Sequence, residues 1–148
     1  MAGRIYSLTF AAVAVAAVQD FFQISAASNV AIIIHEWQVG TEATVSETVR
    51  VRMARATAGT VTGSPVLRPH DAGSPVADSN MDINDTTQLT VGDIHLEDYM
   101  NLVTGFHHLP TPEDRIKIPG GGLYMISMQT APGASTLMSG RIVIEESG

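Results

Sequence analysis

The sequence predicts an all-β protein, folded as an antiparallel two-sheet β-sandwich with jelly-roll-like connections. Apolar and polar residues alternate with a period of two in many short segments, whereas the helical period of 3.6 is scarcely visible. Clusters of Gly, Pro, Asn and Asp separate about eight such segments, and one long excursion interrupts them. An immunoglobulin-like sandwich is the second arrangement that these observations allow.

The chain length predicts a single domain spanning residues 1–148, because 148 residues and 15.7 kDa are close to the commonest domain size. Hydrophobic residues make up 45% of the chain and aromatic residues only 5%, which predicts a core of aliphatic side chains. The sequence contains no cysteine, so disulfides and thiolate zinc sites are excluded.

The first segment is predicted to be a strand. Residues 4–18 imitate a secretory signal, including a small-residue triplet at 14–16. Polar side chains at Tyr6, Ser7 and Thr9 interrupt the apolar run, however, and the alternation around them is that of a strand. No uncharged apolar run reaches about 18 residues, which excludes a membrane-spanning helix.

The alanine- and valine-rich run 11–17 is the predicted oligomer seam. Small apolar side chains pack closely across symmetric interfaces. A mean hydropathy of +0.16 also leaves more apolar residues than one modest core needs. The candidate interface residues in this run are Ala11, Val13, Val15 and Ala17.

Two segments supply the middle strands. Residues 30–39 form an almost continuous apolar run, which predicts a central strand with Trp37 in the main core. Residues 49–55 alternate apolar side chains with arginines, which predicts a strand with one buried and one polar face. The arginines of the polar face meet water or a partner, and the candidate interface residues among them are Arg50, Arg52 and Arg55.

Residues 59–84 are rich in Gly, Ser, Pro, Asp and Asn and are predicted to be one long loop. Loops of this length are uncommon in compact domains, so this one is a candidate contact arm. Asp78, Asp82 and Asp85 offer oxygen ligands at alternating spacing that could hold Ca²⁺, although the Gly and Glu of an EF-hand loop are missing. Asx turns are the favoured interpretation.

The last third of the chain predicts further strands and turns. Residues 86–91 resemble a strand, residues 98–103 a short helical turn, and residues 109–113 a rigid connector. Pro110 and Pro112 exclude a central strand there and are candidate interface residues. Two strands follow, over residues 123–129 and 137–146, each preceded by a turn rich in glycine or proline.

The charge balance excludes two classes of partner. Fifteen acidic against eight basic side chains give a net charge of −7. Such a field repels phosphate backbones and anionic lipid headgroups, so neither nucleic acid nor a membrane is expected as a partner.

The side chains that could carry chemistry predict no active site, metal or cofactor. The five histidines are His35, His70, His95, His107 and His108. A cupin-type metal site needs an H-x-H pair, whereas His107 and His108 are consecutive and would face opposite sides of a strand. No G-x-S-x-G motif is present, and Gly120–Gly122 lacks the Lys-Ser/Thr of a phosphate-binding loop. The pair Glu113–Asp114 is interpreted as solvated charge.

Four segments carry a family resemblance: residues 4–10 (RIYSLTF), 18–24 (VQDFFQI), 109–116 (LPTPEDRI) and 137–146 (LMSGRIVIEE). They resemble small virion proteins of tailed phages and prophages. The resemblance implies a capsid decoration or cement subunit on the outer capsid surface of the virion, bound to the major capsid protein and commonly a homotrimer. The chain departs from the family pattern over residues 34–40 and 59–84.

We therefore expect a structural phage protein that stabilises the head, and no enzyme. The alternative is a carbohydrate- or receptor-binding module of a phage tail or fibre, because jelly-roll sandwiches often bind sugars through exposed loops. The scarcity of aromatic residues, on which sugars usually stack, weighs against this alternative.

Overall fold

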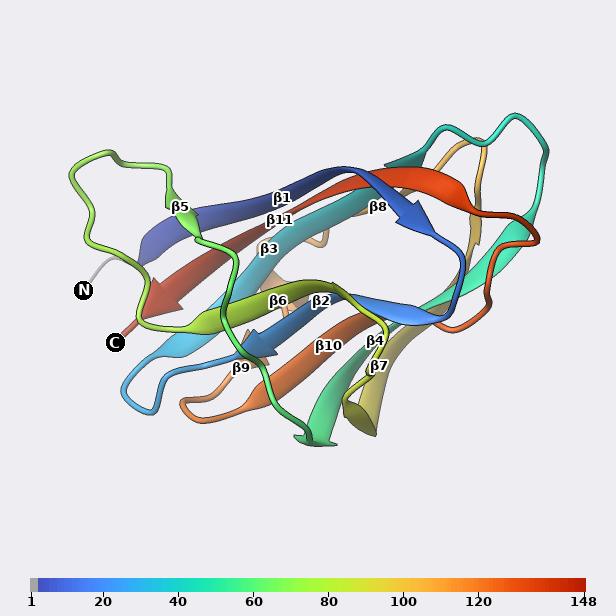
Figure 1. Ribbon diagram of the computed structural model, residues 1–148. Coiled ribbons are helices and arrows are strands. Elements are labelled where there is room, and N and C mark those ends of the chain that lie inside the picture. Colours follow the sequence, from blue (N-terminus) through green and yellow to red (C-terminus); the bar gives the residue numbers. More distant parts are fainter. Residues whose placement is uncertain (1–2) are drawn as a thin grey trace.

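The computed structural model describes residues 3–148, which form two antiparallel sheets packed face to face (Figure 1). Eleven strands and one short 3-10 helix build the two sheets and their connections. In chain order they are β1 (Arg4–Val15), β2 (Gln19–Ser25), β3 (Ala31–Thr41), β4 (Thr48–Ala58), β5 (Arg68–Pro69), β6 (Asn80–Asp85), β7 (Thr90–Asn101), β8 (Phe106–His108), η1 (Pro112–Asp114), β9 (Lys117–Ile118), β10 (Leu123–Met128) and β11 (Thr136–Ser147).

The strand order is that of a jelly roll. Sheet A has the order β5-β1-β11-β3-β8, with β9 also paired to β3, and sheet B has the order β6-β2-β10-β4-β7. From β1 to β4, and again from β7 to β8 and from β10 to β11, the chain crosses to the other sheet at each step. The predicted antiparallel two-sheet sandwich is therefore confirmed.

The core lies between the two sheets and is built from aliphatic and aromatic side chains of both inner faces. Trp37 is fully buried, as predicted. Its ring stacks on Phe106 with the centroids 5.0 Å apart, and its indole N–H donates to the sulfur of Met53 at 3.1 Å. Val49 and Val51 of β4 are also buried, in agreement with the alternation read from residues 49–55.

Residues 98–103 do not form the predicted helical turn. Strand β7 continues to Asn101 and pairs along its whole length with β4. Met100 faces the core and is fully buried. The ladder partner supplied by β4 and the buried apolar contact outweigh the weak local preference for a turn.

The excursion 59–84 is not a free arm. It contains β5, which pairs with β1, and β6, which pairs with β2. Met81 of β6 is fully buried in the core. The sequence resembles a loop because β6 carries several Asx residues, but Asp82 accepts hydrogen bonds from the backbone of residues 62–63 and Asn84 accepts one from the side chain of Gln19, so neither breaks the strand.

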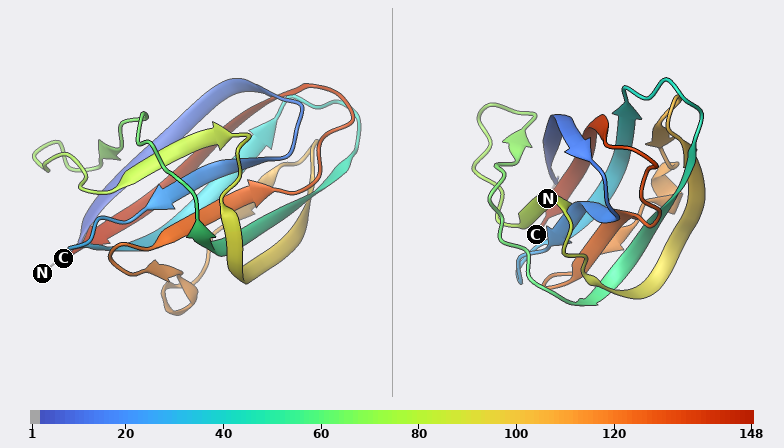
Figure 2. Two further views of the ribbon diagram at one scale, coloured as in Figure 1. Left: turned by 60° about the horizontal axis from the view of Figure 1, so that its bottom comes forward. Right: turned by 45° about the vertical axis from the view of Figure 1, so that its right-hand side comes forward.

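One end of the sandwich gathers four connections, and we call it the loop end. Its segments are residues 16–18, 42–47, 102–105 and 129–135, at the right of Figure 1. The beginning of β1 and the end of β11 lie together at the opposite end (Figures 1 and 2). Among residues 3–148 no helix is long and apolar enough to cross a membrane.

Candidate functional site

The predicted seam along 11–17 is only partly on the surface. Ala11 and Ala17 are exposed and Val13 is half-buried. Val15 is 0% exposed and belongs to the core, so its place in a surface seam was wrong. The reason is a β-bulge between Phe10 and Val13, which inserts one extra residue and resets the alternation of inward and outward side chains.

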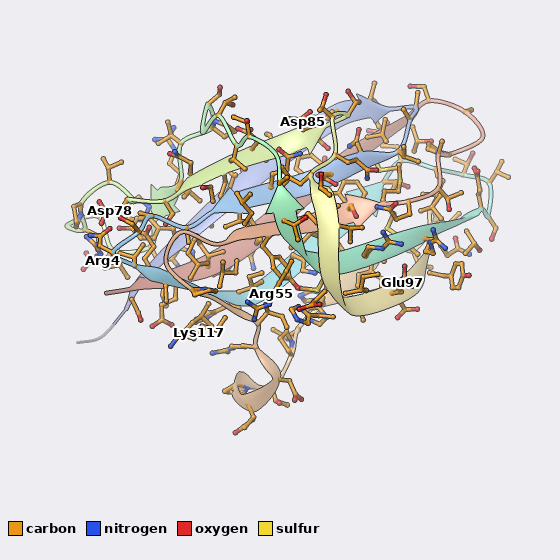
Figure 3. All side chains as sticks on the ribbon, turned by 90° about the horizontal axis from the view of Figure 1, so that it is seen from below. Arg4, Arg55, Asp78, Asp85, Glu97 and Lys117 are labelled. Carbon is orange, nitrogen blue, oxygen red and sulfur yellow. The ribbon has the colours of Figure 1, made fainter. Side chains whose placement is uncertain are left out.

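The arginines of β4 do not share one surface. Arg52 forms an ion pair with Glu97 of β7, with the guanidinium nitrogen 2.6 Å from the carboxylate oxygen. Arg55 instead pairs in register with Tyr124, whose pKa is raised by burial and held back by the nearby guanidinium. All three predicted arginines, Arg50 included, are half-buried. Figure 3 shows Arg55 and Glu97 at separate places along the sandwich.

Pro110 and Pro112 lie in the connection between β8 and β9, away from the loop end. Pro112 is exposed and begins η1, whereas Pro110 is half-buried. The structure therefore does not bring the prolines together with Ala11 and Ala17 into one contact surface.

The histidines are dispersed. His35 and His107 contact two different glutamates on the outer face of sheet A, at 2.7 Å and 2.8 Å. His95 contacts the hydroxyl of Tyr124 at 2.9 Å, and its pKa is lowered by burial and by nearby Arg55. Within residues 3–148 no group of three His, Asp or Glu side chains is arranged to hold a metal ion.

The three aspartates considered for Ca²⁺ bind different partners. Asp78 pairs with Arg4 at 3.3 Å. Asp82 accepts hydrogen bonds of 2.7 Å and 2.8 Å from the backbone of residues 62–63. Asp85 accepts from a backbone N–H two residues further on, and Figure 3 shows it far from Asp78. Only Asp85 forms the local contact that the Asx interpretation predicts, whereas Asp78 and Asp82 bind residues distant in the chain, and the three gather no common ligand set.

Part of the outer face of sheet B is covered by the chain itself. The connections after β4 and after β6 run across this face (Figure 2). Val61 and Leu89, from these two connections, pack on Ala54 and Met125 of the sheet. This part of the face therefore has its own small apolar cluster, whereas Tyr99 of β7 stays 66% exposed.

Two carboxylates hold the crossing connections in place. Asp82 binds residues 62–63, and burial of its carboxylate is outweighed by these donated hydrogen bonds, so its pKa is lowered. Asp20 accepts from the backbone N–H of Leu89 at 2.9 Å and from the side-chain amide of Gln23 at 2.8 Å. Burial dominates there and raises the pKa of Asp20. Both carboxylates have structural partners, and Asp82 also lines a surface hollow of about 370 Å³.

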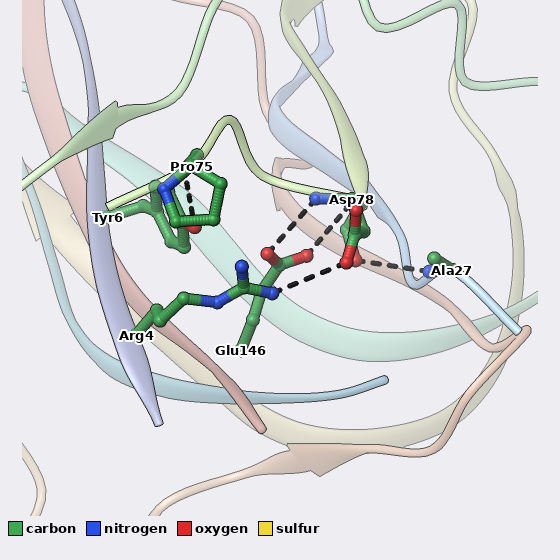
Figure 4. Close-up of polar contacts among 7 residues, drawn as sticks. Arg4, Tyr6, Ala27, Pro75, Asp78 and Glu146 are labelled. Atoms are coloured by element: carbon green, nitrogen blue, oxygen red, sulfur yellow. Dashed lines mark hydrogen bonds and ion pairs between the residues drawn. The ribbon is translucent and has the colours of Figure 1, made fainter. Parts of the chain in front are cut away.

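A third buried carboxylate anchors the excursion to the last strand. Glu146 accepts hydrogen bonds from the backbone N–H groups of Asp78, at 3.1 Å, and Ser79, at 2.8 Å (Figure 4). The hydroxyl of Tyr6 donates to the carbonyl of Pro75 at 2.9 Å in the same region. Residues 75–79 are thus fixed to both β1 and β11.

The connections of the loop end carry exposed apolar side chains. Val45 is 74% exposed, Val103 48% and Leu137, at the start of β11, 38%. Further small apolar side chains exposed on these connections are Ala16, Ala17, Val18, Ala131 and Ala134. The charged residues of the four segments are Glu42 and Glu47. Apolar patches of this kind on a sandwich mark interaction surfaces.

The outer face of sheet A is open and hollowed. One hollow, of about 560 Å³, includes Gln38, His107 and Arg141 in its lining. A second hollow, of about 190 Å³, lies between it and a third, of about 340 Å³, at the loop end. We call the three together the sheet A groove.

Sequence reasoning missed the exposed valines of the loop end. Val45 lies between Thr44 and Ser46, and Val103 follows Leu102 directly before Thr104 and Gly105, so neither belongs to an apolar run of strand length. Their one signal is an aliphatic residue in a short polar segment. An aliphatic residue in a connection indicates a contact surface only when the strand order places several such connections at the same end of the sandwich.

No protein family matches this chain, and searches among curated proteins and among solved structures likewise give no significant match. The fold, the loop end and the sheet A groove therefore carry the functional argument.

Proposed function

We propose that this chain is a structural protein of a tailed-phage virion, a capsid decoration subunit that binds the outside of the major capsid lattice and stabilises the head. The observation that carries the proposal is the loop end, where exposed aliphatic side chains from four connections gather on one surface. The resemblance of four segments to small virion proteins supports the same assignment. The subunit acts by burying surface, with no chemical step.

Burial of the loop end supplies the binding free energy. Removing apolar surface from water stabilises a contact by about 25 cal/mol per Å², so a few valine and leucine side chains contribute several kcal/mol. A homotrimer would present three such ends to the lattice. Release would then require breaking three contacts together, which raises the effective affinity well above that of one subunit.

The test is cosedimentation with expanded capsids that lack the decoration protein. We expect saturable binding in a fixed ratio to the capsid lattice, and a free particle mass by light scattering of three times the 15.7 kDa chain. Absence of saturable binding to capsids, together with binding to cells or glycans, contradicts the proposal and favours the tail or fibre alternative.

A matched pair of variants locates the contact. Val45→Asp places a charge in the loop end, whereas Val76→Asp places it in the excursion, at a valine that is equally exposed (74% and 76%). We expect Val45→Asp to lose capsid binding and Val76→Asp to keep it, because an unpaired charge in an apolar contact is costly. Equal binding by both variants would show that the loop end is not the contact surface.

A further inference from the structure

We infer that the sheet A groove receives an extended segment of the capsid partner, in which an aliphatic side chain stands next to a lysine or arginine. This inference rests on the proposed function and adds to it a second contact, continuous with the loop end.

The groove is continuous because its hollows share lining residues. The 560 Å³ hollow on the outer face of sheet A and the 190 Å³ hollow are both lined by Gly40 and Ser139. The 190 Å³ hollow and the 340 Å³ hollow at the loop end are both lined by Glu42 and Leu137. The groove therefore runs from the face of the sheet to the loop end.

Gly40 keeps the groove open. It is an exposed residue of β3, and a Cβ added there would meet no atom within 4 Å. A glycine inside a strand is less favourable than alanine by roughly 0.5–1 kcal/mol, because the unfolded chain has more conformational freedom to lose. Glycine at such a position often marks the close approach of another backbone.

The charges along the groove determine what fits in each part. At the sheet end, Arg141 contacts the carboxylate of Glu36, which also accepts from His107 at 2.8 Å, so the cation there is already neutralised. At the loop end the lining contains Glu42 and Glu47. Glu42 forms no ion pair with any described residue. A lysine or arginine of the partner would form an ion pair with Glu42.

The shape and the lining favour an extended peptide. Ala43, Val45 and Leu137 beside Glu42 form an apolar hollow with an acidic border, which suits an aliphatic side chain followed by a basic one. The sheet end offers Thr9, Gln38 and Ser139, which can hydrogen-bond a peptide backbone. An extended chain places successive side chains on opposite sides, so one segment can satisfy both parts.

The experiment adds two matched pairs of variants to the capsid cosedimentation. Gly40→Tyr fills the groove from a position where an added Cβ meets no atom within 4 Å, and Gly73→Tyr puts the same side chain in the excursion, where the atom nearest to the added Cβ lies at 3.5 Å. Glu42→Lys reverses the charge of the groove, and Glu113→Lys reverses an exposed charge on η1. Thermal unfolding of each variant shows that it is folded.

We expect Gly40→Tyr and Glu42→Lys to weaken capsid binding at least tenfold, with Gly73→Tyr and Glu113→Lys unchanged. Wild-type binding retained by both groove variants overturns the groove and leaves the decoration function intact. Failure of the wild type itself to bind overturns both. A lower particle mass for free Gly40→Tyr shows that a second copy of the chain occupies the groove, which also overturns the inference. If Gly40→Tyr fails to fold, Glu42→Lys decides.

Discussion

The two outer faces of the sandwich are treated in opposite ways by the same chain. Part of the outer face of sheet B is covered by two connections, which are held down by buried carboxylates. The outer face of sheet A is left open, with polar side chains and a continuous groove. Sheet B therefore has stabilising contacts on part of its outer face as well as on its inner face, whereas the outer face of sheet A is the one that we propose to bind a partner.

The register of sheet A shows how its open face is built. Thr9, Arg141, Gln38 and His107 are consecutive partners across β1, β11, β3 and β8. All four side chains point away from the core and line the 560 Å³ hollow. Substitutions in this row should therefore affect binding more than stability.

The largest loss of stability is expected from a substitution beneath a connection that covers part of the outer face of sheet B. Asp20→Ala removes the acceptor for the backbone N–H of Leu89 and for the amide of Gln23, both of which are buried. We expect the free energy of unfolding to fall by about 3 kcal/mol, because each orphaned buried donor is costly. Urea unfolding measures it. A loss below about 1 kcal/mol would mean that the connection at 86–89 is not held by this carboxylate.

The next largest loss of stability is expected from a substitution of Asp82, and it depends on pH. Asp82→Asn should lower the free energy of unfolding by about 2 kcal/mol at neutral pH, because the donors of residues 62–63 lose a charged acceptor. The pKa of Asp82 is lowered from its usual 3.8, so its contribution is present above that value and is lost as the pH falls through the folded pKa.

The wild type and Asp82→Asn should therefore converge in stability in acid. Urea unfolding at several pH values gives this comparison, and amide hydrogen exchange should show lost protection confined to the segment around Thr62. A constant stability difference across the acid range would assign the effect to packing rather than to charge.

A smaller effect is expected on the open face. Glu36→Gln breaks the contacts with Arg141 and His107, and it should cost about 1 kcal/mol because the pair is near the surface. The hydrogen bond from His107 lowers the pKa of Glu36 from 4.5, with Arg141 contributing. The stabilisation that Glu36 contributes is therefore lost as the pH falls through its lowered pKa. Thermal unfolding at pH 7 and in acid measures the loss of stability and its dependence on pH. A loss as large as that of Asp20→Ala would show that the outer face of sheet A contributes as much to stability as that of sheet B.

The smallest effect is expected for Gln38→Ala, in the middle of the open row. The side chain is exposed and lines the groove, so the free energy of unfolding should change by less than about 0.5 kcal/mol. Capsid binding should weaken nevertheless. A clear loss of stability without a loss of binding would show that Gln38 contributes to folding rather than to the contact with the partner.

The sequence was sufficient for the fold class and for the burial of Trp37, because both follow from the period of the apolar residues. It was insufficient for Val15, because the inward direction of this side chain depends on the bulge between Phe10 and Val13. Ala12, within the bulge, has a φ of 52°, a backbone conformation that alanine rarely adopts. It was also insufficient for the excursion 59–84, where Asp82 acts through residues that are distant in the chain. The loop end and the groove depend on strand order, which the period of residues does not encode.

The pairing of β1 with β11 has a consequence for synthesis. Residues 4–15 find their main ladder partner in residues 136–147, the last of the described strands in chain order, and β11 also separates β1 from β3 within the sheet. Sheet A therefore has no native ladder at its centre until β11 has been made. Until then β1 and β3 lack their shared central partner, so the nascent chain exposes apolar strand edges that favour aggregation.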